Sequence, residues 1–425
     1  MIEPHATLLP QGLRLLVGRA PHAGTCSVAV FVRWGSANES ARSNGIGHVL
    51  EHMAFKGTAV DGRVRDARQV NLEAERLGAE VNAHTDKDHT AYYMRGLPQH
   101  AVRMLQMLAE IVLHPSLPAV ELERERQVLL QEFAEDEDDP VATAFKLMDK
   151  ASFGLHPAAQ PVMGTRRNLE QFTRDDLMAH RSAGYLAGHV VVGVVGDVQP
   201  EQMQREVEAA FAAVPAGALA PVPAPAWRGE ILTRAQAGSS QSHLALGFPV
   251  PSRRDDDPVA GVAAALLGEG MSSPLLDRVR EQRGLAYYAA CSADVLDMCG
   301  QFVVEASMAP ADAVPLVSEV MALMREHAAH AAPAELERAR CQLAVRALRT
   351  QERGLRWLED MALEWLATGQ LRPEHERTAR LMAVSAEQVR AHFETLLRLP
   401  PALALTGAVA RGMRDRLRQA VTRAA

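Results

Sequence analysis

Two histidines and a glutamate lie at a spacing that suits a metal ion within a largely apolar segment, residues 45–58. Read as a helix, this segment places His48 and His52 one turn apart on one face, with Glu51 beside them. Burying an unpaired neutral imidazole would cost about 2–7 kcal/mol, and a bound zinc ion removes that cost. A carboxylate on the same face can take a proton from a nearby water molecule. The H-x-x-E-H pattern therefore predicts a zinc site, and the alternative is a pair of core histidines held by backbone carbonyls.

A zinc site needs a third protein ligand, and an amphipathic helix that begins after Pro118 offers one. Glu125 and Glu132 lie seven residues apart on this helix, which places them on one face, two turns apart. We predict that Glu132 is the third ligand, within about 8 Å of the imidazoles, and that Glu125 orients hydrogen bonds around the ligands. The alternative is a solvated face of Glu/Arg pairs, which is our interpretation of Glu121 and Glu123.

These two segments resemble the pitrilysin, insulysin and mitochondrial processing peptidase family of zinc metallopeptidases, also called inverzincins. Residues 48–58 match one family signature, and residues 125–132 match another about eighty residues later. The resemblance implies a peptide-hydrolysing enzyme with one Zn²⁺ per chain. Carried over position by position, it implies zinc ligands at His48, His52 and Glu132, a general base at Glu51, and a supporting catalytic glutamate at Glu125.

Residues 78–85 resemble the edge strand to which this family adds an extended substrate. An unpaired strand offers N–H and C=O groups to any peptide, so selection by side chains can be loose. Asn82 and Ala83 are the substrate-binding residues that we expect here. A simple hairpin over residues 81–93 is compatible with this interpretation.

Two further histidines lie in or near the turn of that hairpin, at residues 86–88. They are His84 and His89, and we expect neither of them to bind the metal.

In the second half of the chain, residues 270–287 resemble a further family signature with an arginine and a tyrosine seven residues apart. These are Arg280 and Tyr287, for which the resemblance implies catalytic and substrate-binding roles. An arginine fork can hold a substrate carbonyl, and a tyrosine hydroxyl can stabilise the oxyanion that forms when water attacks the peptide bond. A surface arginine and a strand tyrosine are the alternative.

A proline-rich segment, residues 214–226, predicts a linker between two domains. The order of expected elements is alike on both sides, which indicates an internal duplication. We predict an α+β fold in which each domain has a mixed, largely antiparallel sheet covered by helices. Residues 1–213 would form the zinc-binding domain, and residues 227–425 a homologous domain with the Arg/Tyr pair. There, residues 263–268 take the place of the zinc helix and contain no histidine, so no metal site is expected.

Periodicity predicts particular elements in the first half. Strands are expected at residues 27–34 and 190–195, and helices at residues 98–113 and 118–135.

Composition sets limits on the class of protein. The chain has 425 residues, of which 48% are hydrophobic and 23% charged, enough for two cores. Its net charge of −7 argues against nucleic acid as a partner. The four cysteines show no C-x-x-C pairing, which favours a reducing compartment. No signal sequence or apolar run long enough to span a membrane is present, so we expect a cytoplasmic protein, or a periplasmic one if a leader was removed.

These motifs and the resemblance predict a zinc-dependent metalloendopeptidase that hydrolyses extended peptides or unfolded segments. The resemblance further implies that cleavage takes place inside a closed chamber. The resemblance implies a homodimer, or a heterodimer with a similar chain. The alternatives are a non-catalytic structural or partner subunit of a peptidase-like complex, and a module that captures peptides without cutting them.

Overall fold

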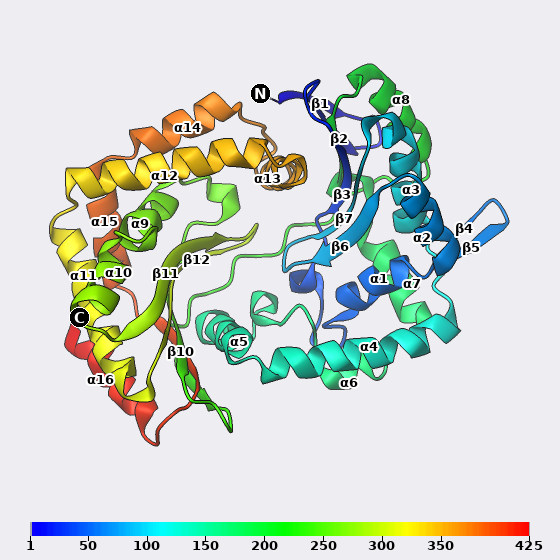
Figure 1. Ribbon diagram of the computed structural model, residues 1–425. Coiled ribbons are helices and arrows are strands. Elements are labelled where there is room, and N and C mark those ends of the chain that lie inside the picture. The colour runs from blue at the N-terminus through cyan, green and yellow to red at the C-terminus, as the bar shows by residue number, and fades with distance from the viewer. Residues whose placement is uncertain (1, 425) are drawn as a thin grey trace. The chain divides into compact units, whose positions relative to one another are not determined.

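The computed structural model describes residues 2–424 and, for residues 3, 423 and 424, the backbone alone (Figure 1). The described chain divides into two compact units. The first comprises the chain up to Phe133 together with Gln160–Val222 and Arg349–Leu371. The second comprises Ala134–Ala159, Pro223–Leu348 and the chain from Arg372 onward.

A six-stranded sheet forms the centre of the first unit, in the order β1-β2-β8-β3-β7-β6. All neighbouring pairs are antiparallel except β2 and β8, which are parallel, and β6 lies at an edge. The strands are β1 (Glu3–Leu8), β2 (Arg14–Arg19), β3 (Cys26–Val32), β6 (Glu80–Thr85), β7 (Thr90–Gly96) and β8 (Val190–Gly196). A separate small hairpin consists of β4 (Gly57–Val60) and β5 (Arg63–Asp66).

Both faces of this sheet are covered, because the side chains of a strand alternate between its two faces. From β3, Val28 and Val30 enter the larger core, whereas Phe31 enters a second core with Trp357. Most helices of the unit flank the larger core: α1 (Ile46–Ala54), α2 (Ala67–Arg76), α3 (Ala101–Leu113), α4 (Ala119–Asp138), α6 (Arg166–Leu169), α7 (Arg174–Gly184) and α8 (Pro200–Ala210). The opposite face is covered by α13 (Gly354–Thr368).

A five-stranded sheet forms the centre of the second unit, in the order β11-β12-β10-β13-β9. Only β13 and β9 are parallel. The strands are β9 (Ile231–Ala235), β10 (Ser242–Val250), β11 (Ala286–Val295), β12 (Gly300–Met308) and β13 (Ala402–Gly407). The helices are α5 (Pro140–Phe153), α9 (Val259–Gly268), α10 (Pro274–Leu276), α11 (Ala313–Ala329), α12 (Pro333–Gln351), α14 (Glu374–Ala383), α15 (Ala386–Leu397) and α16 (Met413–Ala424).

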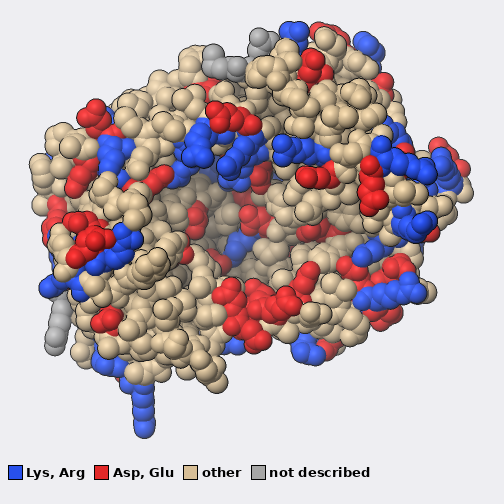
Figure 2. Space-filling model, viewed as in Figure 1, with Lys and Arg blue, Asp and Glu red and all other residues tan. Residues whose placement is uncertain are grey.

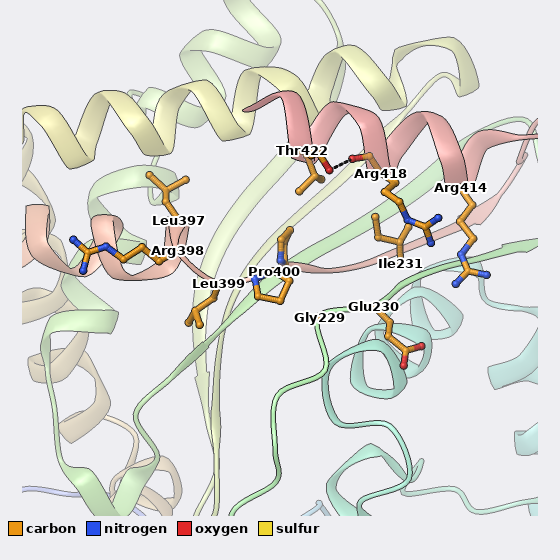
Figure 3. A pocket seen from close by; sticks show the side chains of 12 residues that line it. Gly229, Glu230, Ile231, Leu397, Arg398, Leu399, Pro400, Arg414, Arg418 and Thr422 are labelled. Carbon is orange, nitrogen blue, oxygen red and sulfur yellow. Dashed lines mark hydrogen bonds between the residues drawn. The ribbon is translucent and has the colours of Figure 1, made fainter. Parts of the chain in front are cut away.

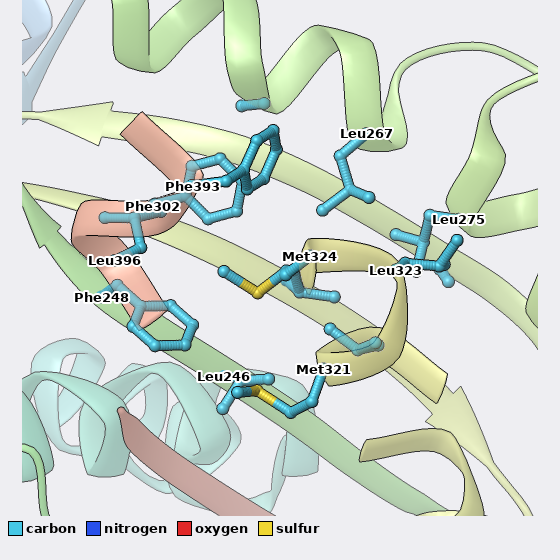
Figure 4. Close-up of a cluster of buried hydrophobic side chains, with 14 of the residues drawn as sticks. Leu246, Phe248, Leu267, Leu275, Phe302, Met321, Leu323, Met324, Phe393 and Leu396 are labelled. Atoms are coloured by element: carbon cyan, nitrogen blue, oxygen red, sulfur yellow. The ribbon is translucent and has the colours of Figure 1, made fainter. Parts of the chain in front are cut away.

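The main core of this second unit lies between the sheet and helices α9, α11 and α15. Figure 4 shows Phe248 and Phe302 of the sheet beside Met321 and Met324 of α11 and Phe393 of α15. The other face of the sheet packs on α5, whose Met148 and Ala151 join a smaller core.

The predicted fold class is confirmed, since both units are sheets covered by helices. The predicted strands correspond to β3 and β8, and the predicted helices to α3 and α4. Residues 215–230 form neither helix nor strand, and residues 263–268 lie in α9. Among the described helices, none combines the length and apolar composition that crossing a membrane requires.

Candidate active site

The histidine pair lies on α1, where apolar residues anchor the helix to the core of the first unit. Val49, Leu50 and Met53 are buried there, which leaves His48 and His52 together on another face. Their ring centroids are 4.6 Å apart. The helical period therefore separates the residues that pack from the residues that are free to bind a ligand.

The start of α1 is held by Glu39, which is only 3% exposed. Its carboxylate accepts hydrogen bonds from the backbone N–H groups of Gly45 (2.7 Å) and Gly47 (2.8 Å) and from Nδ2 of Asn44 (3.0 Å). Burial raises the pKa of Glu39 to about 7, although these three donors act in the opposite direction. A carboxylate at a helix N-terminus satisfies N–H groups that have no partner within the helix. Glu39 thereby fixes the position from which α1 begins.

Glu132 approaches the histidine pair from α4. Its Oε2 lies 3.5 Å from Nε2 of His52 and 4.0 Å from Nε2 of His48. One ligand atom from each residue lies within 4.8 Å of the other two. Bonds of about 2.0–2.1 Å at tetrahedral angles place neighbouring ligand atoms about 3.3 Å apart. The three side chains therefore fit a zinc ion after small adjustments.

The protonation state of His48 suits a metal ligand. Burial, and then the neighbouring charge of His52, lower the pKa of His48 to about 4. His48 is accordingly neutral at pH 7, as a metal ligand must be. Nδ1 of His52 lies 2.9 Å from Oε1 of Glu125, which leaves Nε2 of His52 free to face Glu132.

Glu125 connects His52 to a cation. Its Oε2 lies 2.5 Å from Nζ of Lys56, while its Oε1 contacts His52. Burial by itself would raise the pKa of Glu125, but the hydrogen bonds from Lys56 and His52 outweigh it and lower the pKa. Glu125 therefore stays ionised and orients the imidazole of His52.

Glu51 has a different environment, although it lies on the same helix as the histidines. It is 8% exposed, and Oγ1 of Thr85 donates a 2.6 Å hydrogen bond to its Oε2. Burial raises the pKa of Glu51, and the hydrogen bond from Thr85 and the charges of His52 and His84 only partly offset this. A carboxylate with a raised pKa is a stronger base than an ordinary glutamate, which suits proton transfer near neutral pH.

Three residues in this arrangement were not predicted from the sequence. Lys56 and Thr85 lie inside the segments that carry the resemblance, and this position could have marked them as candidate site residues. The residue that each one contacts depends on the fold. Glu39 gave no signal, because it lies outside both segments and reaches the helix through a loop.

Acidic side chains gather over the C-terminal part of α4 (Figure 2). There the sequence from Glu132 carries a run of acids: Glu135, Asp136, Glu137 and Asp138. Part of this negative charge is compensated, because Asp136 and Glu137 pair with Lys146 and Glu137 also pairs with Arg234.

Asn82 and Ala83 lie on β6, the edge strand of the first sheet. Ala83 is buried in the core, whereas the side chain of Asn82 is exposed and its Oδ1 accepts a 2.8 Å hydrogen bond from the backbone N–H of Ala83. This local hydrogen bond occupies one N–H group of the edge strand.

Arg280 and Tyr287 lie in the second unit. Arg280 belongs to a π-helical turn, Asp277–Gln282, and its Nε pairs with Oε1 of Glu281 at 2.6 Å. Tyr287 lies on β11 and is 87% exposed. Short π-helical turns are rare and occur frequently at functional sites.

A cavity of about 400 Å³ lies elsewhere in the second unit, between β9, α15 and α16 (Figure 3). Its wall combines apolar side chains such as Ile231 and Leu397 with Arg398, Arg414 and Arg418. It contains none of the predicted site residues.

Two family models match the chain. The model described as insulinase, peptidase family M16, matches residues 14–166, and the model described as the peptidase M16 inactive domain matches residues 171–343. Among curated proteins, an uncharacterized zinc protease of Mycobacterium leprae is 31% identical over 92% of this chain and 88% of its own length. Another, from Streptomyces coelicolor, is 29% identical over 98% of this chain and 92% of its own length.

Solved structures show the same fold at low sequence identity. A crystal structure of a peptidase M16 inactive domain from Pseudomonas fluorescens has a TM-score of 0.86 and 23% identity, covering 96% of this chain and 99% of that one. A protease from Helicobacter pylori has a TM-score of 0.85 and 21% identity, covering 96% and 100%. A chain of complex III from Candida albicans has a TM-score of 0.85 and 16% identity, covering 98% and 99%.

Proposed function

Because the chain belongs to the insulinase family of peptidases, peptidase family M16, we propose that it is a zinc-dependent endopeptidase that hydrolyses extended peptides or unfolded segments. The observation that carries this proposal is the convergence of His48, His52 and Glu132, whose ligand atoms lie within 4.8 Å of one another. Glu51 lies on the same helix as both histidines.

In this proposal His48, His52 and Glu132 hold the zinc ion. When bound, the ion supplies positive charge that polarises the scissile carbonyl and makes water more acidic. Glu51 takes a proton from the attacking water and returns it to the leaving amide nitrogen. Thr85 holds the carboxylate of Glu51 in place through its 2.6 Å hydrogen bond.

Glu125 and Lys56 act through His52 in this proposal. The carboxylate of Glu125 accepts the Nδ1 proton of His52, so that Nε2 keeps its lone pair for the metal. Lys56 keeps Glu125 ionised. Both are therefore positioning residues for the zinc ligand.

We further propose that the substrate binds in an extended conformation along β6. A peptide that pairs with this edge would replace the hydrogen bond that Asn82 now makes to the N–H of Ala83. Backbone pairing accepts many sequences, which suits an enzyme that acts on unfolded segments.

Arg280 and Tyr287 are proposed to act on the same peptide bond from the second unit. The hydroxyl of Tyr287 would donate to the developing oxyanion, and the guanidinium of Arg280 would hold a substrate carbonyl. We also propose that a second chain, identical or similar, closes the chamber.

A non-catalytic structural or partner subunit is the second candidate function. It is supported by one observation, the match of residues 171–343 to the model described as the peptidase M16 inactive domain. The two candidates differ in one respect that can be measured, because only the peptidase needs a working Glu51.

The test combines zinc content with cleavage of a mixed peptide pool, before and after removal of the metal by a chelator. We expect one zinc ion to occupy the site formed by His48, His52 and Glu132 in each chain. Cleavage should be abolished by the chelator and recover on adding zinc. Glu51→Gln is the control for a contaminating protease, since it should hold zinc and cut nothing. Cleavage that survives both the chelator and this substitution, or bound zinc without any cleavage, would contradict the peptidase proposal.

A further inference from the structure

A second group of two histidines and one glutamate lies in the first unit, apart from His48, His52 and Glu132. His84 comes from β6, His89 from the turn before β7, and Glu359 from α13. One ligand atom from each of these three lies within 4.8 Å of the other two. Three chain segments therefore bring metal-binding side chains to one place, on the face of the sheet that α13 covers.

The nitrogen–oxygen distances in this second group are as close to those around a tetrahedral metal as the distances in the first group. Oε1 of Glu359 lies 3.1 Å from Nε2 of His84 and 3.6 Å from Nε2 of His89. A tetrahedral metal needs about 3.3 Å between neighbouring ligand atoms. The corresponding nitrogen–oxygen distances around Glu132 are 3.5 and 4.0 Å.

In each of the two groups, a further carboxylate lies within hydrogen-bond distance of Nδ1 of one histidine. Nδ1 of His89 lies 2.7 Å from Oδ1 of Asp88, as Nδ1 of His52 lies 2.9 Å from Oε1 of Glu125. A metal-binding histidine almost always donates its other N–H in this way, which fixes the tautomer and the orientation of the ring. Asp88 is itself buried, at 5% exposure.

One atom in the group lacks a hydrogen-bond partner. His89 is 3% exposed, and its Nε2 makes no hydrogen bond within the described residues, the distance of 3.6 Å to Glu359 being too long for one. Leaving a buried polar atom without a hydrogen-bond partner destabilises the folded protein. A metal bonded to this nitrogen would remove that destabilisation.

We propose that Nε2 of His84, Nε2 of His89 and Oε1 of Glu359 bind a second divalent transition metal ion, separate from the proposed catalytic zinc. Two imidazoles and one carboxylate suit Zn²⁺ and related ions and leave a fourth position for water. The side chain of His84 is 40% exposed, which gives the ion access from solvent.

A metal at this place would join the hairpin of β6 and β7, which ends at Gly96, to α13, which begins at Gly354. The residue after His84 is Thr85, whose hydroxyl holds Glu51. The second ion would thus stabilise the strand that supplies a partner to the proposed general base. The expected role is structural, with an increase in stability as its signature.

The competing occupant of the site is a proton. Without a metal, burial would lower the pKa of His89, but the hydrogen bond to Asp88 and the nearby carboxylate of Glu359 outweigh this and raise the pKa to about 9. A charged His89 would then form an ion pair with both carboxylates, and the group would bind no metal.

The experiment measures bound metal in the full-length protein after equilibration with zinc and removal of the excess. We expect two zinc ions per chain in the wild type, one in His84→Ala, one in His48→Ala/His52→Ala, and none in the triple variant. His22→Ala is the matched control, since it removes an exposed histidine outside both groups and should retain two ions. Circular dichroism checks that each variant is folded, and Glu359→Gln replaces His84→Ala if that variant is not.

A second readout separates this proposal from the peptidase proposal, on which it does not depend. In the His48→Ala/His52→Ala background, zinc should raise the Tm of the protein, and adding His84→Ala should abolish the increase. The proposal is overturned if His48→Ala/His52→Ala binds no zinc and is not stabilised by added zinc. In that case His84, His89 and Glu359 form an ion pair and no metal site. The peptidase proposal fails on a different result, namely a wild-type protein that holds zinc without cutting peptides.

Discussion

Glu51 and Glu125 are both in or near the candidate metal centre, yet their surroundings give them opposite acid–base properties. Glu51 is buried with one hydroxyl as its partner, and its pKa is raised. Glu125 contacts a lysine and a histidine, and its pKa is lowered. One carboxylate is therefore suited to move protons and the other to remain a fixed negative charge.

The first prediction concerns Glu51→Gln. The amide keeps the shape of the side chain but cannot accept a proton, so kcat/KM should fall by about 10²–10⁴-fold, the usual contribution of a general base. Zinc content should stay unchanged because Glu51 is not one of the proposed ligands. Glu121→Gln, a change at a partly exposed residue of α4 that pairs with Arg124, is the control and should leave both values intact. Normal turnover in Glu51→Gln would remove Glu51 from the base role.

The second prediction concerns pH and His180 of α7. Nε1 of Trp34 donates a 3.0 Å hydrogen bond to Nε2 of His180, and burial lowers the pKa of this histidine to about 4. The unfolded chain takes up the proton below about pH 6.5, whereas the folded chain does so only near pH 4. The contribution of His180 to stability is therefore complete above pH 6.5 and is lost as the pH falls toward 4.

Between pH 7 and pH 5, this linkage should cost about 2 kcal/mol of unfolding free energy. His180→Gln keeps an acceptor for Trp34 but does not titrate, so urea unfolding of this variant should show a loss smaller by that amount. His22→Gln, at an exposed site, should behave like the wild type. Parallel pH profiles for the wild type and His180→Gln would show that His180 is not the titrating group.

At the scale of elements, the position of α1 depends on its first turn. Gly45 has φ 98°, a left-handed conformation that favours glycine, and a Cβ at this residue would lie 2.8 Å from Cα of Gly164. Glu39 then binds the N–H groups of Gly45 and Gly47. Residues 39–45, which precede the H-x-x-E-H motif, therefore fix the position of the histidine pair.

The third prediction concerns Glu39→Gln. The amide nitrogen of glutamine cannot accept the hydrogen bond that one oxygen of Glu39 now accepts, so an N–H group at the start of α1 is left unpaired. The free energy of unfolding should fall by about 1–3 kcal/mol. Zinc affinity should fall with it, because the histidine pair loses its fixed position. Arg42→Gln, a neighbouring exposed change, should alter neither quantity, and equal stability of the two variants would contradict the anchoring role.

At the scale of the whole molecule, the proposed reaction uses groups from both compact units. The zinc ligands and Glu51 belong to the first unit, and Arg280 and Tyr287 to the second. Substitutions in the second unit should therefore affect turnover while leaving the metal in place.

The fourth prediction tests this division with Tyr287→Phe. Loss of a hydroxyl that stabilises the oxyanion should lower kcat about 10²-fold, with zinc content unchanged. The adjacent Tyr288 provides a matched control, because its hydroxyl donates to Oε1 of Glu305. Tyr288→Phe should keep kcat near the wild-type value. A Tyr287→Phe enzyme with unchanged kcat would exclude the oxyanion role.

Much of the fold and of the candidate site could be predicted from local patterns. A helix repeats every 3.6 residues, so His48, Glu51 and His52 had to be neighbours once the segment was helical. Continuous apolar runs likewise predicted the buried strands β3 and β8. The family and the fold class are confirmed on this basis, whereas the roles of the site residues stay predictions.

The rest was decided by the tertiary structure, because contacts between distant segments leave no periodic trace in the sequence. No local sequence pattern shows that α13 covers the first sheet, or that Glu359 lies beside His84 and His89. We accordingly did not expect these two histidines to be metal ligands. The reach of Glu39 to α1 has the same origin. The sequence by itself determined which side chains share a helix or a strand, since backbone hydrogen bonding sets that spacing. Only long-range packing of apolar faces decided which of these elements meet.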